Sequence, residues 1–138
     1  MREILFRGKR KDNAEWVEGD LLQLHDGRKY IVNNKFGACI DDKGNFINTE
    51  APFVCEVIPE TVGQYTGLTD KNGKEIFEGD ILKFHDRLVV VFWHTHLGRW
   101  DSNFLKYTNN ENGRDDMSPS RWGYKSEVIG NIHDNPEL

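Results

Sequence analysis

The chain has 138 residues, of which 37% are hydrophobic and 30% charged, and its net charge of −5 at pH 7 argues against a general affinity for nucleic-acid backbones. Sixteen aromatic residues argue against disorder, and no stretch approaches the roughly 20 apolar residues of a membrane-spanning helix. The first residues turn charged before a signal-peptide apolar region could form. Two cysteines, Cys39 and Cys55, are too few for a disulfide framework, so we expect a cytoplasmic protein.

The predicted elements are short strands separated by turns. Lys29–Val32 and the longer run Leu88–Trp93 are β-branched and apolar, which predicts buried strands. Asn72-Gly73 is a hairpin signal, and Asp26-Gly27 marks another turn. No window of twelve or more residues has the periodicity and end signals of an amphipathic helix. Many short strands without helices favour an all-β protein built from small barrels.

A repeat with a spacing of sixty residues organises the chain. The ten residues from Val17 to Asp26 match those from Phe77 to Asp86 at six positions, and the four differences include Leu/Ile and Leu/Phe. The repeated Glu-Gly-Asp motif comprises Glu18, Gly19 and Asp20 in the first copy and Glu78, Gly79 and Asp80 in the second. We assign it a structural role, because glycine supports bends or bulges and aspartate bonds nearby backbone amides.

The repeat predicts two tandem units produced by an internal duplication. The first unit spans residues 1–65 and the second spans residues 66–138. A polar stretch near residues 101–121, with the run Asn109–Asp116 at its centre, is predicted to be a loop inserted in the second unit.

Four segments resemble the YopX family of phage and prophage proteins. They are the central segment Gly63–Ile81, the opening Arg2–Arg7 with Trp16–Asp20, and the ending Val128–Leu138. The resemblance implies an all-β fold in which the two tandem units are small SH3-like β-barrels. It also implies a protein of a mobile element that works in the bacterial cytoplasm. The resemblance supplies no catalytic residues.

Histidines form the most metal-like cluster in the sequence. His94 and His96 are two residues apart, so on a strand their rings share one face. His85 and Asp86 precede the same strand and could add ligands across the hairpin. A metal-dependent hydrolase using His85, His94 and His96 is therefore one alternative, which competes with an ordinary surface or packing role. We expect no metal and no cofactor.

The repeated carboxylates do not point to catalysis. Glu18 with Asp20, and Glu78 with Asp80, could form acid–base pairs, but the intervening glycine indicates a bent backbone instead. The sequence shows no arranged nucleophile and base and no phosphate-binding glycine loop. We therefore predict that the protein is not an enzyme.

Aromatic and basic residues alternate in the second half. Such residues can stack on bases and pair with phosphates, although large aromatic side chains also fill small cores. The candidate ligand-binding residues are Trp93, Arg99, Trp100, Arg121, Trp122 and Tyr124.

The sequence therefore favours a non-enzymatic binding protein of a phage or prophage. Its partner would be a protein, held through an edge strand or loops, or a small nucleotide-like ligand. Duplex DNA and membranes are not expected partners. A structural component that assembles as a homo-oligomer is the remaining alternative.

Overall fold

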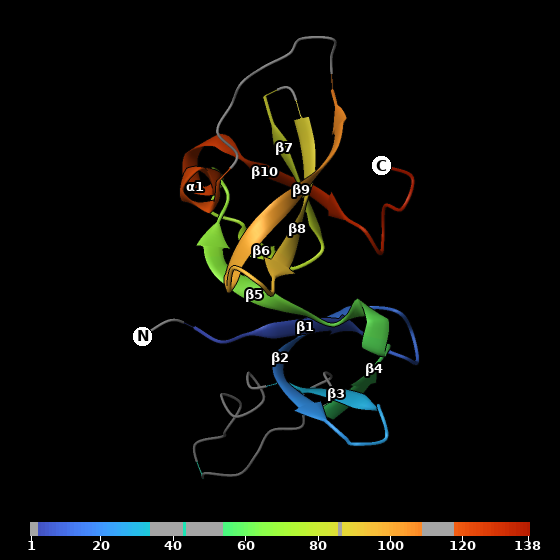
Figure 1. Ribbon diagram of the computed structural model, residues 1–138. Coiled ribbons are helices and arrows are strands. Elements are labelled where there is room, and N and C mark those ends of the chain that lie inside the picture. The colour runs from blue at the N-terminus through green and yellow to red at the C-terminus, as the bar shows by residue number, and fades with distance from the viewer. Residues whose placement is uncertain (1–2, 34–42, 44–53, 86, 109–117) are drawn as a thin grey trace. The chain divides into compact units, whose positions relative to one another are not determined.

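The protein is all-β, with one short α-helix among the residues that the structure describes (Figure 1). The structure is a computed structural model, and it describes residues 3–33, 43, 54–85, 87–108 and 118–138. The chain divides into two compact units, an N-terminal unit from Glu3 to Gln64 and a C-terminal unit from Tyr65 to Leu138.

The strands are short, as the turn-rich sequence predicts. Those that begin in the N-terminal unit are β1 (Phe6–Lys9), β2 (Trp16–Gln23), β3 (Lys29–Val32), β4 (Val54–Val57) and β5 (Gly63–Thr69), with the 3-10 helix η2 (Pro59–Thr61) before β5. The C-terminal unit adds β6 (Glu75–Phe77), β7 (Asp80–Phe84), β8 (Arg87–His94), β9 (Arg99–Tyr107), η3 (Pro119–Arg121), α1 (Trp122–Lys125) and β10 (Glu127–Asn131).

Strand β2 organises the N-terminal unit by changing partners along its length. Its first half, Trp16–Gly19, pairs with β1, and its second half, Asp20–Gln23, pairs with β3. Strand β4 pairs with β3, and Gly63 and Gln64 of β5 pair with β1. All of these pairings are antiparallel.

The change of partner occurs where a glycine lets two backbones approach. A Cβ atom on Gly19 would lie 2.0 Å from the carbonyl oxygen of Val32, far inside van der Waals contact. Gly19 is buried, so no side chain can be accommodated there without moving β3. The close approach explains why a glycine interrupts an otherwise strand-forming run.

The end of β1 also meets β4. Arg10 and Val57 form an isolated antiparallel bridge, the N–H of Ile58 donates to the carbonyl of Lys9 at 2.8 Å, and that of Lys11 donates to Glu56 at 3.0 Å. This contact is a single bridge and not a strand pairing.

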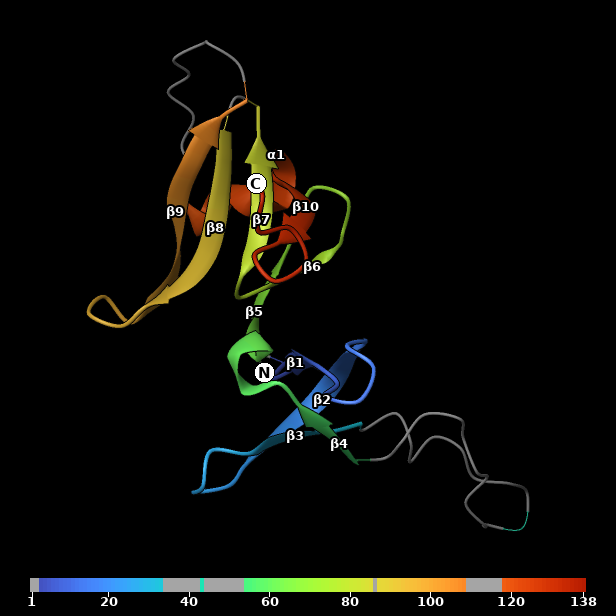
Figure 2. The same cartoon turned by 90° about the vertical axis from the view of Figure 1, so that its right-hand side faces the viewer.

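The C-terminal unit contains a four-stranded antiparallel sheet in the order β10-β7-β8-β9. Figure 2 shows β9 at one edge of this sheet and β10 at the other. A hairpin of β5 and β6 belongs to the same unit. The buried core of the unit consists of Ile76, Leu82, Phe84, Val89, Val91, Trp100 and Trp122.

Several sequence predictions about strands are confirmed, and two need correction. Strand β3 has the predicted bounds, and Leu88–Trp93 lies within β8. Residues 101–107, which the sequence placed in an inserted loop, belong to β9, because they pair with β8. The polar run from Asn109 to Asp116 lies outside the described residues.

The closed barrels are the second correction. The strand orders are open among the described residues, and the core of the C-terminal unit includes Trp122 from α1.

Replacing Gly19 by alanine tests the backbone approach at the bend of β2. We expect Gly19→Ala to lower the free energy of unfolding by about 1–3 kcal/mol, because an added Cβ must displace the Val32 backbone. Gly123→Ala is the control, since its Cβ would meet only the Thr69 oxygen at 3.9 Å and alanine favours the helix. Urea denaturation followed by circular dichroism measures both, and equal stabilities of the two variants would contradict the prediction.

Candidate functional site

Two of the candidate ligand-binding tryptophans are part of the core. Trp122 is fully buried and Trp100 is 9% exposed, and both pack with Leu82, Val89 and the rest of the core of the C-terminal unit. Trp122 is the first residue of α1, a single helical turn. Ser126 Oγ donates a hydrogen bond to the Trp122 carbonyl at 2.7 Å and caps the end of this turn. The ring of Trp122 is therefore not accessible for stacking on a base.

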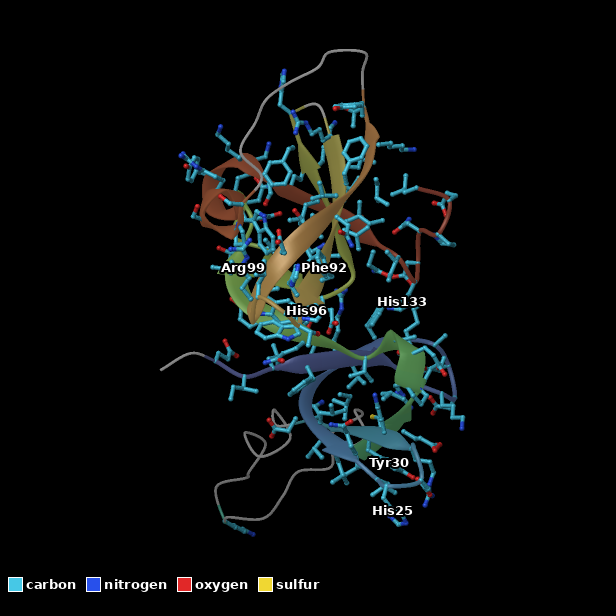
Figure 3. All side chains as sticks on the ribbon, viewed as in Figure 1. His25, Tyr30, Phe92, His96, Arg99 and His133 are labelled. Atoms are coloured by element: carbon cyan, nitrogen blue, oxygen red, sulfur yellow. The ribbon has the colours of Figure 1, made fainter. Side chains whose placement is uncertain are left out.

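Trp93 and Arg99 lie where β8 turns into β9. Figure 3 labels Arg99 and His96 beside this turn. Trp93 is 43% exposed and meets the edge of Trp100 with ring centroids 5.1 Å apart. Arg99 forms an ion pair with Asp101 at 3.6 Å. Both candidates flank the turn, but only Trp93 extends the core outward through Trp100, since Arg99 is paired with Asp101.

Arg121 and Tyr124 form a third group on η3 and α1. The Arg121 guanidinium lies over the Tyr124 ring, 5.6 Å from its centroid, and Nη1 donates to the phenol oxygen. Tyr124 is 56% exposed. The six candidate residues thus separate into a buried pair, a turn pair and a helix pair.

The histidine cluster does not converge on one point. His85 follows β7 at the turn into β8, whereas His94 ends β8 at the opposite turn. Seven residues of strand between positions 87 and 94 span about 23 Å, so His85 cannot share an ion with His94 and His96. His94 Nδ1 accepts the N–H of Leu97 at 3.2 Å. Among the described residues, no group of three histidine, cysteine, aspartate or glutamate side chains could hold a metal ion; Asp86 lies outside them.

The two copies of the Glu-Gly-Asp motif have different surroundings. Asp80 is 1% exposed and its carboxylate accepts the N–H of Phe77 at 2.8 Å, at a turn where Gly79 has φ of 88°. Asp20 is exposed within strand β2. The buried carboxylate of Asp80 is thus hydrogen-bonded to the backbone of its own turn.

A lysine-rich cavity of about 330 Å³ opens on the C-terminal unit, which we call the lysine pocket. Three segments build it: the β5–β6 turn, the end of β7, and α1 with the start of β10. Its polar lining consists of Lys71, Lys83, His85, Tyr124, Lys125 and Glu127. The described part of this lining holds three lysines and one glutamate, so it is locally positive on an acidic chain.

A buried carboxylate fixes the turn that carries Lys71. Asp70 is 2% exposed, and its Oδ1 accepts the N–H groups of Asn72 and Lys74, both at 2.9 Å. Its Oδ2 accepts the N–H of Val128 in β10 at 2.9 Å, and the N–H of Lys71 donates to Ser126 at 3.0 Å. The turn predicted at Asn72-Gly73 is therefore present and is attached to β10 beside the lysine pocket.

These hydrogen bonds set the protonation of Asp70. Burial by itself would raise the pKa of this carboxyl, but the N–H groups of Val128, Lys74 and Asn72 and the charge of Lys74 together lower the pKa below its ordinary value. Asp70 is thus a charged structural group across the neutral pH range.

The C-terminal half of β9 has two exposed aromatic side chains on the face of the sheet that carries the core. Phe104 lies opposite Val89 and Tyr107 lies opposite Arg87, and residues opposite each other in a sheet share a face. Val89 is part of the core, so Phe104 and Tyr107 continue the core face. Nevertheless they are 50% and 46% exposed.

A β-bulge keeps these two rings together. The register shifts between Leu88 and Val89, so that Leu105 is an extra residue on β9. Without it, Phe104 and Tyr107 would point to opposite faces. Their ring centroids are 4.9 Å apart, and the Arg87 guanidinium lies 5.7 Å from the centroid of Tyr107. We call Phe104 and Tyr107 the β9 aromatic face.

Sequence reasoning missed the lysine pocket. Lys71 and Lys83 are twelve residues apart and Lys125 is a further forty-two, so no local spacing connects them. The available signal was Lys83, a single charge within the apolar strand Ile81–Phe84, whose side chain points away from the core residues on either side.

No helix of the described part of the chain is long and apolar enough to cross a membrane. The fold and these surfaces define an all-β protein of two units, and its C-terminal unit has β9 at the edge of the described sheet and a lysine-rich pocket.

The chain belongs to the YopX family, because residues 5–138 match the family described as YopX protein, and the resemblance seen in the sequence is confirmed. A similar solved structure is that of protein EF1440 from Enterococcus faecalis, with 26% sequence identity and a TM-score of 0.53 over 100% of this chain and 99% of that chain. No match was found among curated proteins.

Substitution of two tryptophans separates a core role from a surface role. We expect Trp122→Ala to cost about 3–5 kcal/mol of stability, because it empties a buried site. Trp93→Ala should cost about 1 kcal/mol, the worth of one edge-to-face contact with Trp100. Thermal and urea denaturation measure both, with Trp122→Phe as a milder variant if the alanine variant does not fold. A Trp122→Ala protein as stable as the wild type would contradict the core assignment.

The Asp70 carboxylate makes stability depend on pH. Asp70→Asn should lower the free energy of unfolding at pH 7 by about 1.5–3 kcal/mol, the worth of hydrogen bonds to a charged group. Because the pKa of Asp70 is lower in the folded protein, its contribution is complete above the unfolded-state pKa of about 3.9 and is lost as the pH falls through the folded-state value.

Urea denaturation at pH 7 and at pH 3 should therefore show a difference between wild type and Asp70→Asn that shrinks in acid. Asp26→Asn, which changes an exposed carboxylate paired with Arg28, is the control and should have a smaller effect. A pH-independent difference would contradict the role of the charge.

Proposed function

We propose that this YopX-family protein is a non-enzymatic binding protein of a phage or prophage that holds another protein in the bacterial cytoplasm. Its N-terminal unit would be an SH3-like scaffold, and its C-terminal unit would bind the partner through the β9 aromatic face and the open edge of β9. The observation that carries this proposal is the exposure of Phe104 and Tyr107 on the core side of an edge strand.

Three features support the SH3-like part of the proposal. Strand β2 is bent and pairs first with β1 and then with β3. The 3-10 helix η2 precedes β5, which pairs with β1. A single bridge joins the end of β1 to β4. Small barrels use such a shared, bent strand to connect their two layers. The family resemblance implies the same type of fold for each unit.

The edge of β9 favours an extended polypeptide as the partner. The strand has nine residues and pairs only with β8 among the described strands, so the backbone groups on its other side can accept an added strand. Exposed edges of this length attract other strands, and proteins normally shield them.

The exposed rings of Phe104 and Tyr107 indicate which side chains such a segment would have. An added strand presents alternate side chains to the same face of the sheet, so apolar residues at every second position would cover Phe104 and Tyr107. Covering both rings would complete the core face that Val89 and Val91 begin. We therefore propose an extended segment of another protein with alternating apolar side chains.

A photo-crosslinking amino acid in place of Leu105 tests the proposal, because this residue is exposed at the bulge of β9. The protein is irradiated in an extract of the bacterial host, the crosslinked segment is sequenced, and the corresponding peptide is synthesised. We expect this peptide to bind the purified protein and to form strand-type hydrogen bonds with β9, detected by amide exchange in nuclear magnetic resonance spectra.

The double variant Phe104→Ala/Tyr107→Ala should weaken peptide binding at least about 100-fold, because two aromatic contacts are lost. The matched control is Ile4→Ala/Leu22→Ala, which removes two apolar side chains of the N-terminal unit that are on average at least as exposed as Phe104 and Tyr107, and it should bind as the wild type does. Equal weakening by both double variants would overturn the proposal. Crosslinks only to a second copy of the chain, with a dimer in light scattering, would also overturn it and favour self-assembly.

A further inference from the structure

The lysine pocket has the composition of an anion-binding site. Lys71, Lys83 and Lys125 reach it from three different segments, and His85 lies on the same wall. Glu127 is the one acidic residue among the described residues of the lining, and it lies directly opposite Lys83 across the β7–β10 ladder. Among the residues of the lining that the structure describes, lysines therefore outnumber acidic groups, although the whole chain carries a net charge of −5.

The backbone around the pocket is held in place by buried groups. The Asp70 carboxylate attaches the turn of Lys71 to β10, and the Lys71 N–H is bonded to Ser126, the residue after Lys125. Ser126 is fully buried and closes α1, whose Trp122 is anchored in the core. The backbone positions that carry Lys71 and Lys125 are thus fixed before a ligand binds, which lowers the entropy that ordering this part of the chain would cost.

An aromatic ring completes the pocket. Tyr124 lines it with a ring that is more than half exposed, and the Arg121 guanidinium covers part of that ring. An exposed aromatic face beside lysines can stack on a nucleobase while the lysines meet a phosphate.

From these observations we propose that the lysine pocket binds a mononucleotide, with its phosphate among Lys71, Lys83 and Lys125 and its base against Tyr124. The cavity of about 330 Å³ is at the small end of ligand pockets, which run from about 300 to 1,000 Å³, and so suits one nucleotide rather than an oligonucleotide. The acidic net charge also opposes binding of a polyanion. This site is separate from the β9 aromatic face and does not depend on the protein-binding role.

Three probes test the proposal by isothermal titration calorimetry with the full chain: adenosine 5′-monophosphate, adenosine and inorganic phosphate. We expect saturable binding of the monophosphate, tighter than that of adenosine or phosphate. Lys71→Ala and Lys83→Ala should each weaken binding of the monophosphate about 10-fold, because each substitution removes a charged hydrogen-bond donor. Tyr124→Ala should weaken binding of the monophosphate about 10-fold and leave binding of inorganic phosphate unchanged. Tyr124→Phe should retain binding of both probes.

Lys106→Ala is the control variant, because this exposed lysine of β9 belongs to the same unit and lies outside the pocket. Circular dichroism checks that every variant is folded. Absence of saturable monophosphate binding, or equal weakening by Lys106→Ala and Lys83→Ala, would overturn the proposal. Monophosphate and phosphate bound equally tightly, with no effect of Tyr124→Ala, would overturn the nucleotide assignment.

Discussion

The Asp70 carboxylate is the constraint on which the arrangement of the C-terminal unit depends. It is buried and satisfies three backbone N–H groups, two in its own turn and one in β10. Asp70 and Val128 are 58 residues apart in sequence, so this side chain joins two distant segments together with the backbone hydrogen bond from Lys71 to Ser126. A buried charge is costly unless it is well bonded, and three charge-assisted hydrogen bonds offset that cost.

The fold was predictable as far as local patterns reach. Apolar runs and glycine-containing turns located β3 and β8, because strand formation there depends on neighbouring residues. The polar sequence of β9 did not indicate a strand. Its pairing comes from β8, and only about half of β9 covers the core, so the strand has no regular apolar pattern. The packing of Trp122 in the core joins residues that are far apart in the sequence, so no local periodicity indicates it.

The two Glu-Gly-Asp segments show why similar sequences can have different local structures. Gly19 lies inside a strand and is required by the nearby Val32 carbonyl, whereas Gly79 occupies a turn with positive φ. A glycine is suitable in both places for unrelated reasons, so its identity alone does not indicate the backbone around it. The candidate site was less predictable still, because burial decides whether a tryptophan is a core residue or a ligand contact. Trp122 and Trp93 look alike in sequence and differ completely in exposure.

The proposed lysine pocket and the acidic charge of the whole chain act over different distances. At physiological ionic strength, exposed charges more than about 8 Å apart are largely screened from each other. A small phosphorylated ligand inside the pocket would therefore interact mainly with Lys71, Lys83 and Lys125. A nucleic acid extends far beyond the pocket and would meet the acidic remainder of the surface. Local basicity on an acidic protein thus selects for small anions, whereas a uniformly basic protein would bind polyanions of any length.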